Sequence, residues 1–517
     1  MTSKTAAHRD SATAANPKAG RHPSALRRSL GLLAGILIFA GMIALDPPGD
    51  MPEEAWTVAA IGLLMATWWV LEAIPIPATA LVPIAFFPLF GISSIKATAA
   101  PYANPLIFLF LGGFIIALAM ERWNLHRRIA LNILRIVGTN PAALVAGFMV
   151  ATAFLSMWVS NTATATMMLP IGLSIVALVT AGGMPGQGEG RGERFTPALL
   201  LGIAYSASIG GIGTLIGTPP NALLAGYFAE TYGIEVSFSN WMVMAVPLEI
   251  VLLAIAWFVL THIVFPIRVK ELTGVEDMIS RELKELGSIS RGEKIIAAIF
   301  VTTACLWMFR PLIDKWLPGI SVTDPGIAVI AALVVFVIPV EPQNRVFLLD
   351  WTATQKLPWG VLILFGGGLS LGAAINQTGL SASIATAMGG LSGMPTFALI
   401  LGVVVAVMVI SHLTSNTATA AAFLPLTAAL AVSLGENPLF LTIPMVLAAS
   451  CVFMMPVATP PNAIVFASGE LTVPQMARAG LLINIVSLIL IMLVAYTLME
   501  FAFGIQAGVV PDWVSGG

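Results

Sequence analysis

Charged residues are scarce in this sequence. Of its 517 residues only 10% are Asp, Glu, Lys or Arg, and 58% are hydrophobic, whereas a soluble globular protein carries roughly 25% charged residues. This composition excludes a soluble globular protein and indicates a chain that crosses a membrane many times, with the lipid bilayer as its surroundings. The net charge of −2 offers no basic surface of the kind that binds nucleic acid, so no nucleic-acid partner is expected.

Cysteine and clustered catalytic groups are also scarce. Cys305 and Cys451 both lie in apolar runs, and two isolated cysteines indicate neither a disulfide framework nor a metal site. His126, His262 and His412 are scattered, and none lies near a paired Asp or Cys in the sequence. An intramembrane enzyme needs a nucleophile with a base, or a metal cluster, so no enzymatic activity and no catalytic residue are expected.

Long apolar runs fill the chain between residues 30 and 502. Runs of about 20 residues cross a bilayer as helices, so the sequence predicts an all-α polytopic membrane protein with about 11 transmembrane helices. A basic tail at residues 1–29 precedes the first run and lacks a signal-peptide cleavage pattern. We therefore expect a disordered tail on the cytoplasmic side, and, with an odd number of crossings, a C-terminus outside.

Two polar motifs interrupt the apolar runs, and each occurs twice. Ser-Asn-Thr-Ala-Thr-Ala is found at 160–165 and 415–420, and Thr-Pro-Pro-Asn-Ala at 218–222 and 459–463. Asn161 and Asn416 are 255 residues apart, while the two Thr-Pro-Pro-Asn-Ala motifs are 241 apart, and the difference matches a Gly-rich insert near 181–195. At the same offset of 255, Gly112-Gly113 aligns with Gly367-Gly368. These correspondences indicate an internal duplication.

The two copies have opposite flanking charge. Arginines precede and follow the first copy, whereas only Glu436 follows the second. By the positive-inside rule, the ends of the first copy face the cytoplasm and those of the second face outside. We therefore predict an inverted repeat with two re-entrant helical hairpins, an arrangement in which secondary transporters bind their cargo at the repeat interface near the midplane.

The expected organisation follows from these signals. It comprises the tail (1–29), a first repeat half (30–265) with a hairpin at about 129–180 and a broken helix around 218–222, a cytoplasmic linker helix (266–294), and a second repeat half (295–505) with a hairpin at about 382–434 and a broken helix around 459–463.

The repeated motifs have a common chemistry. Ser-Asn-Thr at a hairpin tip caps the returning helix and leaves N–H groups that favour an anion. Thr-Pro-Pro-Asn breaks a helix and frees carbonyl groups for a cation. None of the four pieces contains Lys or Arg, and a fixed charge at mid-membrane costs at least roughly 2.5–3.5 kcal/mol. The four pieces therefore predict one uncharged site for an anion and its coupling cations.

With the stretch from Trp68 to Pro77, these motifs resemble the divalent anion/sodium symporter (DASS) family, over roughly residues 30–505. The resemblance implies a homodimer in which each protomer has a scaffold domain and a transport domain and works by an elevator mechanism. It also implies the ion sites. Their sodium ligands would be Ser156, Ser160, Asn161 and the Gly217 carbonyl, and Ser411, Ser415, Asn416 and the Ala458 carbonyl.

The resemblance further implies where a substrate carboxylate binds. The expected contacts are Asn161, Thr162, Thr218, Asn416, Thr417, Thr459 and Pro460. Asn221 and Asn462 are expected to brace the loops instead. His412 occupies a position where cotransporters of the family often have an acid. It is either a satisfied core group, a positive charge that replaces a cation, or a group that makes transport pH-sensitive. A positive charge here would weaken the case for strict sodium coupling.

The function implied is sodium-coupled symport of C4-dicarboxylates such as succinate, malate or fumarate, across the inner membrane of a bacterium. Two alternatives stay open on the same fold. One is a sodium-independent exchanger of dicarboxylate or citrate, and the other is a carrier of sulfate or another oxyanion. The sequence does not specify the exact anion or the number of sodium ions.

Overall fold

A computed structural model describes residues 25–181, 191–267, 272, 274–316, 319, 322–387 and 394–514. Residues 1–24 of the basic tail and most of the Gly-rich insert lie outside the described residues. The described chain is helical apart from one short antiparallel pair of strands, β1 (Pro339–Glu341) and β2 (Val346–Phe347). The all-α prediction is confirmed.

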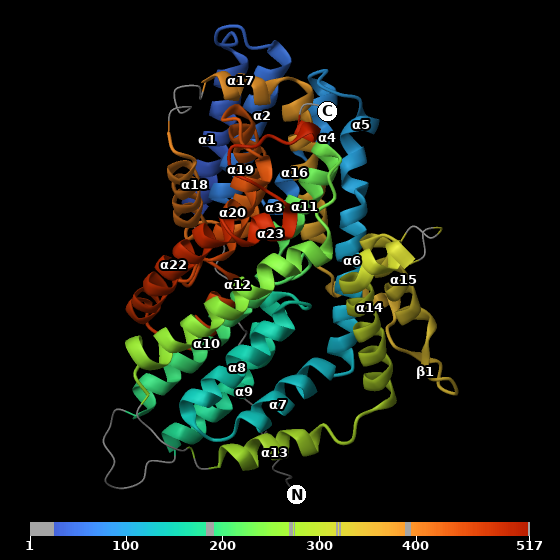
Figure 1. Cartoon of the computed structure of the whole chain (residues 1–517), viewed down its shortest axis with the longest axis vertical. Helices are drawn as coiled ribbons and strands as arrows, with labels where there is room; N and C mark the ends of the chain where they lie inside the picture. The colour runs from blue at the N-terminus through green and yellow to red at the C-terminus, as the bar shows by residue number, and fades with distance from the viewer. Residues whose placement is uncertain are drawn as a thin grey trace, which may run out of the picture.

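The first helices lie in the upper half of the molecule, where they pack on helices of the second repeat (Figure 1). α1 (Ala25–Ile43) packs on α2 (Glu53–Leu71), and short elements follow: α3 (Ile76–Thr79), α4 (Val82–Leu89), α5 (Ile95–Ala99) and η1 (Ala100–Ala103). Glu72 ends α2 in the left-handed conformation with φ 49°, and Pro75 and Pro77 flank the start of α3. The prolines prevent one continuous helix from forming across residues 72–77, because proline fixes φ and has no N–H to donate.

The first repeat begins with α6 (Pro105–Arg122) and α7 (Leu125–Val137). It continues with α8 (Pro141–Ser156), α9 (Asn161–Ala181), α10 (Arg191–Ile212), α11 (Pro219–Tyr232), α12 (Phe238–Phe258) and the π-helical turn η2 (Val259–Val264). The expected hairpin range of 129–180 thus contains part of one more helix. Gly138, at φ 82°, ends α7, and Asn140 then caps α8 by accepting from Ala142 N and Ala143 N.

The linker between the repeats contains α13 (Val275–Glu285), which is amphipathic and buries Val275, Met278 and Ile279. α13 packs on α7, where Glu282 pairs with Arg127. Next come α14 (Arg291–Trp316) and α15 (Asp324–Val337). A buried ion pair between Arg128 and Glu293, with Nε 2.6 Å from Oε1, ties α7 to the start of α14.

The second repeat has the same order of elements. After η3 (Trp351–Lys356) come α16 (Trp359–Gln377), α17 (Leu380–Ala387), α18 (Thr396–Ser411), α19 (Asn416–Ser433), α20 (Pro438–Ser450), α21 (Pro460–Phe466), α22 (Val473–Ala495), α23 (Leu498–Phe503) and η5 (Asp512–Val514). In Figure 1, α8 and α9 lie in the lower half of the molecule and α18 and α19 in the upper half.

Nine helices of the described chain are long and apolar enough to cross a membrane, by length and composition. Shorter apolar helices, among them α8, α15, α18 and α20, add to these. The expected total of about eleven crossings and the re-entrant course of the α8–α9 and α18–α19 pairs stay predictions.

Two repeat-related glycines allow helices to approach closely. A Cβ built on Gly112 of α6 would lie 2.6 Å from the backbone of Ala328 in α15, and one built on Gly367 of α16 would lie 2.3 Å from the carbonyl oxygen of Ala80. These are the first members of the glycine pairs that align at the offset of 255. Both repeats therefore have a glycine at the same position, where the first helix of the repeat approaches the backbone of another element.

We expect Gly367→Ala to destabilise the protein by about 1–3 kcal/mol, because the new methyl group meets backbone and cannot be accommodated without a helix shift. Gly402→Ala is the matched control: Gly402 lies on α18, and a Cβ there meets nothing within 4 Å. It should leave stability unchanged or raise it by up to about 1 kcal/mol through helix propensity. Thermal unfolding of the two purified variants in detergent measures the difference, and equal transitions would contradict the close approach.

Candidate functional site

The first polar motif forms the turn between α8 and α9. α8 ends at Ser156, and Ser160 caps α9 by accepting from Ala163 N at 3.3 Å. Asn161 is the first residue of α9, so its side chain lies at the tip, half-buried, while Thr162 is exposed. The motif thus produces a cap and a helix start at the expected place.

Four oxygen-bearing groups meet at Asn161. Ser156 Oγ lies 2.7 Å from the Asn161 amide and donates to the Ala207 carbonyl oxygen at 2.7 Å. The same amide lies 3.2 Å from the carbonyl oxygens of Gly217 and Ala207. With its nitrogen inward the amide donates to these acceptors, whereas with its oxygen inward it completes a set of four oxygens. The structure therefore brings together Ser156, Asn161 and Gly217, as expected, and adds Ala207 of α10.

The second motif forms the equivalent turn between α18 and α19, but its contacts differ. Asn416 Oδ1 accepts from Thr417 N at 2.8 Å and from Thr417 Oγ1 at 3.3 Å. Ser411 is fully buried, and its Oγ has no hydrogen-bond partner in the described part of the chain. Among the described residues no hydrogen bond joins Ser411, Asn416 and Ala458. Ser415 is half-buried at the cap of α19.

The Thr-Pro-Pro-Asn motifs end two unwound segments. The first segment, residues 213–218, separates α10 from α11, and the second, residues 451–459, separates α20 from α21. Asn221 Nδ2 donates to the carbonyl oxygens of Gly211, Ile212 and Thr214 at 2.8–3.2 Å. In the second copy, Asn462 Nδ2 donates to Met455 O at 3.1 Å. Both asparagines brace their loops, as expected from the sequence.

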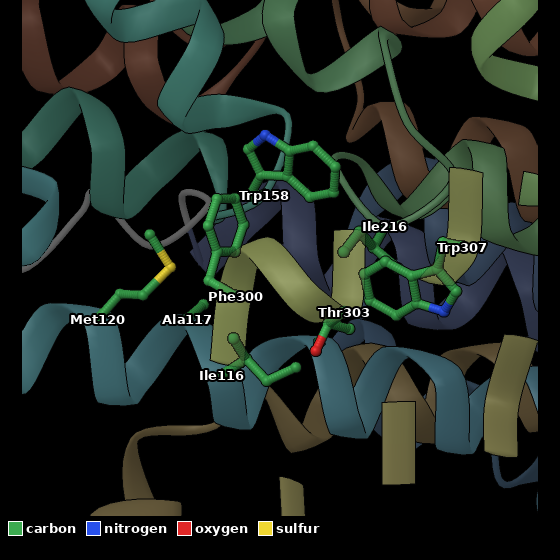
Figure 2. A pocket seen from close by; sticks show the side chains of 9 residues that line it. Ile116, Ala117, Met120, Trp158, Ile216, Phe300, Thr303 and Trp307 are labelled. Atoms are coloured by element: carbon green, nitrogen blue, oxygen red, sulfur yellow. The ribbon is translucent and has the colours of Figure 1, made fainter. Parts of the chain in front are cut away.

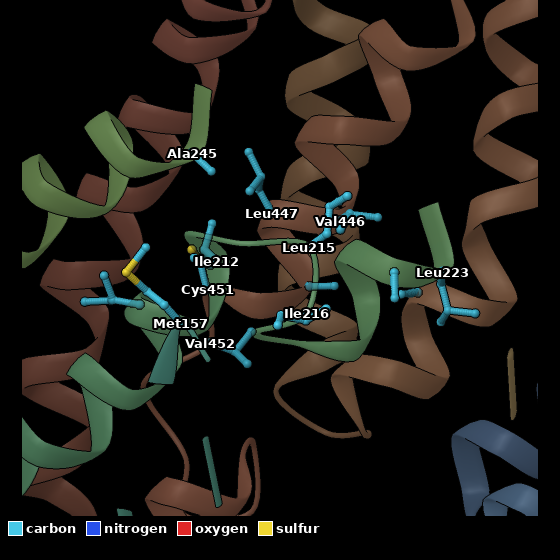
Figure 3. Close-up of a cluster of buried hydrophobic side chains, with 14 of the residues drawn as sticks. Met157, Ile212, Leu215, Ile216, Leu223, Ala245, Val446, Leu447, Cys451 and Val452 are labelled. Carbon is cyan, nitrogen blue, oxygen red and sulfur yellow. The ribbon is translucent and has the colours of Figure 1, made fainter. Parts of the chain in front are cut away.

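The two halves interlock at these segments. α21 packs on α9 and α10, and α11 packs on α19 and α20, so each half-helix after an unwound segment packs on the tip helix of the other repeat. Figure 3 shows the apolar side of this junction, where Ile212, Leu215 and Ile216 gather with Leu447 and Val452 in one buried cluster. The two unwound segments therefore share a core.

The remaining expected substrate contacts differ in accessibility. Thr218 and Thr459 are buried, at 1% and 3% exposed, and Thr218 Oγ1 has no hydrogen-bond partner among the described residues. Thr459 Oγ1 accepts from Asn462 N, and Pro460 is exposed. A cavity of about 260 Å³ adjoins the first tip, with walls that include Glu121, His126, Val159, Ala163 and Thr166.

An aromatic contact seats the first tip against α14. Trp158, in the turn after Ser156, meets Phe300 edge-on at 5.1 Å and stacks on Phe238 at 6.2 Å. Figure 2 shows Trp158 and Ile216 on one side of a small pocket, with Phe300 and Trp307 of α14 and Met120 of α6 around it. The side chains between the tip and these helices are mostly apolar, and Trp158 Nε1 is buried without a hydrogen-bond partner in the described part of the chain.

His412 is a satisfied core group. Its Nδ1 lies 2.6 Å from Met408 O and donates to it, and its Nε2 accepts from Asn484 Nδ2 at 2.7 Å. The Asn484 orientation follows from its other bond, because Asn484 Oδ1 accepts from Phe453 N at 3.2 Å. His412 is therefore a neutral ring that links α18 through α22 to the second unwound segment.

Sequence reasoning missed Ala207 and Asn484. Ala207 contributes a main-chain oxygen, so its side chain carries no signal. Asn484 is a polar residue within the apolar helix α22. A single polar residue in such a helix indicates a buried hydrogen bond, but the sequence does not indicate which residue is its partner.

Comparisons with known proteins agree on one family. The family model described as "Sodium:sulfate symporter transmembrane region" matches residues 26–503. "Sodium-dependent dicarboxylate transporter SdcS" from Staphylococcus aureus strains RF122 / ET3-1 and USA300 is 42% identical over 488 residues, which cover 94% of this chain and 94% of the relative.

Two solved structures share the fold. MtrF of Neisseria gonorrhoeae, which represents a class of antimetabolite efflux pumps, has a TM-score of 0.57 at 14% identity. The match covers 93% of this chain and 100% of MtrF. The YdaH transporter of Alcanivorax borkumensis has a TM-score of 0.54 at 15% identity and covers 88% of this chain and 99% of its own. At these identities the likeness concerns the fold alone.

We expect Asn484→Leu to destabilise the protein by about 1–3 kcal/mol for each buried group that it leaves unpaired, namely His412 Nε2 and Phe453 N. Ile485→Ala, on the same helix and 47% exposed, is the control and should have a much smaller effect. Thermal unfolding in detergent compares the two. If Asn484→Leu unfolds at the wild-type temperature, the link between α18 and the unwound segment is not made.

Proposed function

We propose that this chain, which belongs to the sodium:sulfate symporter family, imports C4-dicarboxylates together with sodium ions. Succinate, malate and fumarate are the expected substrates. The name of the 42%-identical relatives, a sodium-dependent dicarboxylate transporter, supports this substrate class and sodium as the coupling ion.

One observation carries the sodium part of the proposal, namely the convergence of oxygens at Asn161. With its nitrogen inward, the Asn161 amide donates to Ser156 Oγ and to the Ala207 and Gly217 carbonyl oxygens. On this proposal the amide turns its oxygen inward when a sodium ion binds, so that four oxygens surround the ion. Uncharged hydroxyl, amide and carbonyl oxygens are hard ligands of the kind that alkali ions accept, and unwound carbonyls serve this purpose in other transporters. Ser160, at the cap of α9, completes the proposed first set.

The second sodium set is proposed by repeat symmetry. Ser411, Ser415, Asn416 and the Ala458 carbonyl occupy the corresponding positions. Ser411 Oγ is buried without a hydrogen-bond partner in the described chain, and a buried hydroxyl of this kind costs free energy unless something else binds it. A sodium ion would supply that partner once Asn416 Oδ1 turns from Thr417 toward it.

The substrate would bind between the two tips. Asn161 and Asn416 begin α9 and α19, and a helix start favours an anion through its free N–H groups and its dipole. Thr162, Thr417, Thr218, Thr459 and Pro460 would complete the contacts. Two sodium ions and a dianion together are neutral, so the loaded site can cross the membrane without a net charge.

The bonds of His412 favour symport over sodium-independent exchange. An exchanger of this fold would need a fixed positive charge in place of a bound cation. His412 donates to Met408 and accepts from Asn484, so it is neutral and does not supply that charge.

The proposal includes an elevator motion in a homodimer in the inner membrane, with the N-terminus in the cytoplasm and the C-terminus outside. The mostly apolar side chains around Trp158 and Phe300 support such a motion (Figure 2), because apolar contacts can slide without breaking hydrogen bonds.

We expect Asn161→Ala and Asn416→Ala each to reduce sodium-driven succinate uptake at least about tenfold in proteoliposomes, because each removes an oxygen shared by ion and anion; the loss of about 1.4 kcal/mol of binding suffices for that factor. Asn344→Ala, at an exposed turn, is the control and should transport normally. Half-activity in either tip variant would argue against these sites.

The same vesicles separate symport from exchange. Replacing external sodium by choline should abolish uptake, and sulfate should fail to compete with succinate. Unchanged uptake in choline would exclude sodium coupling, and transport of sulfate in place of succinate would identify an oxyanion carrier.

Thr417→Ala should weaken the apparent affinity for succinate more than that for sodium, because the Thr417 hydroxyl and N–H lie at the start of α19 while the ion set uses neighbouring oxygens. Removal of one hydrogen bond to a charged group costs about 1.5–3 kcal/mol, which is a rise of roughly tenfold or more in the KM for succinate. Uptake measured over a range of succinate and of sodium gives both constants. If the apparent affinity for sodium changes more than that for succinate, Thr417 belongs to the ion set and not to the substrate contacts.

A further inference from the structure

Glu249 is a buried acid that the two sodium sets do not use. It lies in the middle of α12, a helix long and apolar enough to cross the membrane, and is 5% exposed. Its Oε2 has no hydrogen-bond partner in the described chain, and none of the ion pairs among the described residues includes it. An ionisable side chain in this position is costly and usually functional.

The carboxylate of Glu249 touches the first unwound segment. A Cβ built on Gly213 would lie 2.0 Å from Glu249 Oε2 and 3.2 Å from Met157 Cε. A side chain at position 213 would therefore displace the carboxylate from its present place. The acid faces backbone that has left the helix.

The same short segment closes the proposed first sodium set. Thr214 Oγ1 donates to Met157 O and accepts from Gly217 N at 3.0 Å, and the Gly217 carbonyl oxygen lies 3.2 Å from the Asn161 amide. Glu249 and Asn161 therefore contact one braced stretch of five residues, 213–217, near its opposite ends. A change in occupancy at one end can alter the other end.

The other charged and titratable groups around α12 do not neutralise Glu249. The helices packed against α12 are α8, α10, α14, α22, α23 and η2. Their described titratable side chains are Arg194, Tyr205, His262, Arg291, Glu293, Lys294, Cys305, Arg310, Asp314, Lys315, Arg478 and Glu500. The hydrogen bonds and ion pairs that the structure gives these groups go to other residues, such as those of Arg310 with Glu235 and Asp324 and of Tyr205 with Met476 O.

We propose that the Glu249 carboxylate binds a third monovalent cation, a sodium ion or a proton, against the unwound segment at Gly213. This inference rests on the proposed function. A dianion and two sodium ions are neutral together, so an ionised Glu249 would leave the loaded protein with one negative charge in the membrane. A third cation removes that charge, and when it is released with the substrate the empty protein returns with the carboxylate uncompensated.

The consequence is a current. Each dicarboxylate enters with three cations, so one positive charge enters the cell per substrate molecule. In Glu249→Gln the side chain keeps its size but is neutral, and the cycle with two sodium ions moves no net charge.

The test measures charge and radiolabelled succinate in the same proteoliposomes under voltage clamp by valinomycin and potassium. We expect one charge per succinate in the wild type and none in E249Q, which still takes up succinate. Glu54→Gln, at an exposed position in the first turn of α2, is the matched control. This variant should still move one charge per succinate. A proton gradient imposed at a fixed sodium gradient identifies the third cation, because it shifts the reversal potential only if that cation is a proton.

A wild-type ratio of zero overturns the proposal, as does a ratio of one in E249Q. If the wild type transports no dicarboxylate at all, the proposed function fails. In that case a direct measurement of cation binding tests the site at Glu249 separately. Sodium titration of thermal stability at several pH values then compares wild type with E249Q. Identical cation dependence in the two would overturn the site, and loss of one bound cation in E249Q would support it.

Discussion

Backbone that leaves a helix inside a membrane has no water to replace its lost hydrogen bonds, and this constraint shapes the centre of the protein. The first segment, 213–218, meets it with Asn221, whose single amide group donates to three carbonyl oxygens. Thr214 and Trp241 take up further backbone groups, Trp241 by donating to Ile212 O. What these braces leave over, above all the Gly217 carbonyl, is what the proposed function assigns to an ion. The loop is thus held by uncharged side chains, and its free oxygens lie in a fixed place.

The interlocking of the repeats gives this arrangement a second property. Since α21 packs on α9 and α11 packs on α19, each unwound segment is positioned by the tip of the other repeat as well as by its own. A movement of one tip therefore changes the packing around both unwound segments. For a cotransporter this is useful, because cargo and ions have to be bound and released together, and a shared apolar core such as that of Ile216 and Leu447 (Figure 3) transmits a shift without polar groups being exposed.

The sequence predicted the elements whose signals are local. Proline pairs, capping serines and asparagines act within a few residues, and α9, α11, α19 and α21 all begin within the four motifs that the sequence singles out. The role of Asn221 was also predictable from its place after the prolines. The separation of α7 from α8 was harder, because Gly138 and Pro141 interrupt an otherwise apolar stretch and their effect depends on tertiary packing. Contacts made through a backbone carbonyl, as at Ala207, leave no trace in residue type, and the pairing of His412 with Asn484 joins residues 72 positions apart.

The two tips are alike in sequence but unequal in structure, and this inequality bears on the proposed cycle. At the first tip Asn161 already contacts Ser156, Ala207 and Gly217. At the second, Asn416 is turned to its own neighbour Thr417, and Ser411 lacks a partner in the described chain. A preorganised set pays less ordering free energy on binding than one that has to rearrange. On the proposed function the first ion therefore requires only that the Asn161 amide turn its oxygen inward, while the second ion requires Asn416 to release Thr417 N. That N–H begins α19 and is one of the groups that would hold a carboxylate. Binding of the second ion would thus free a donor for the substrate, which couples cation and anion at one residue without any fixed charge.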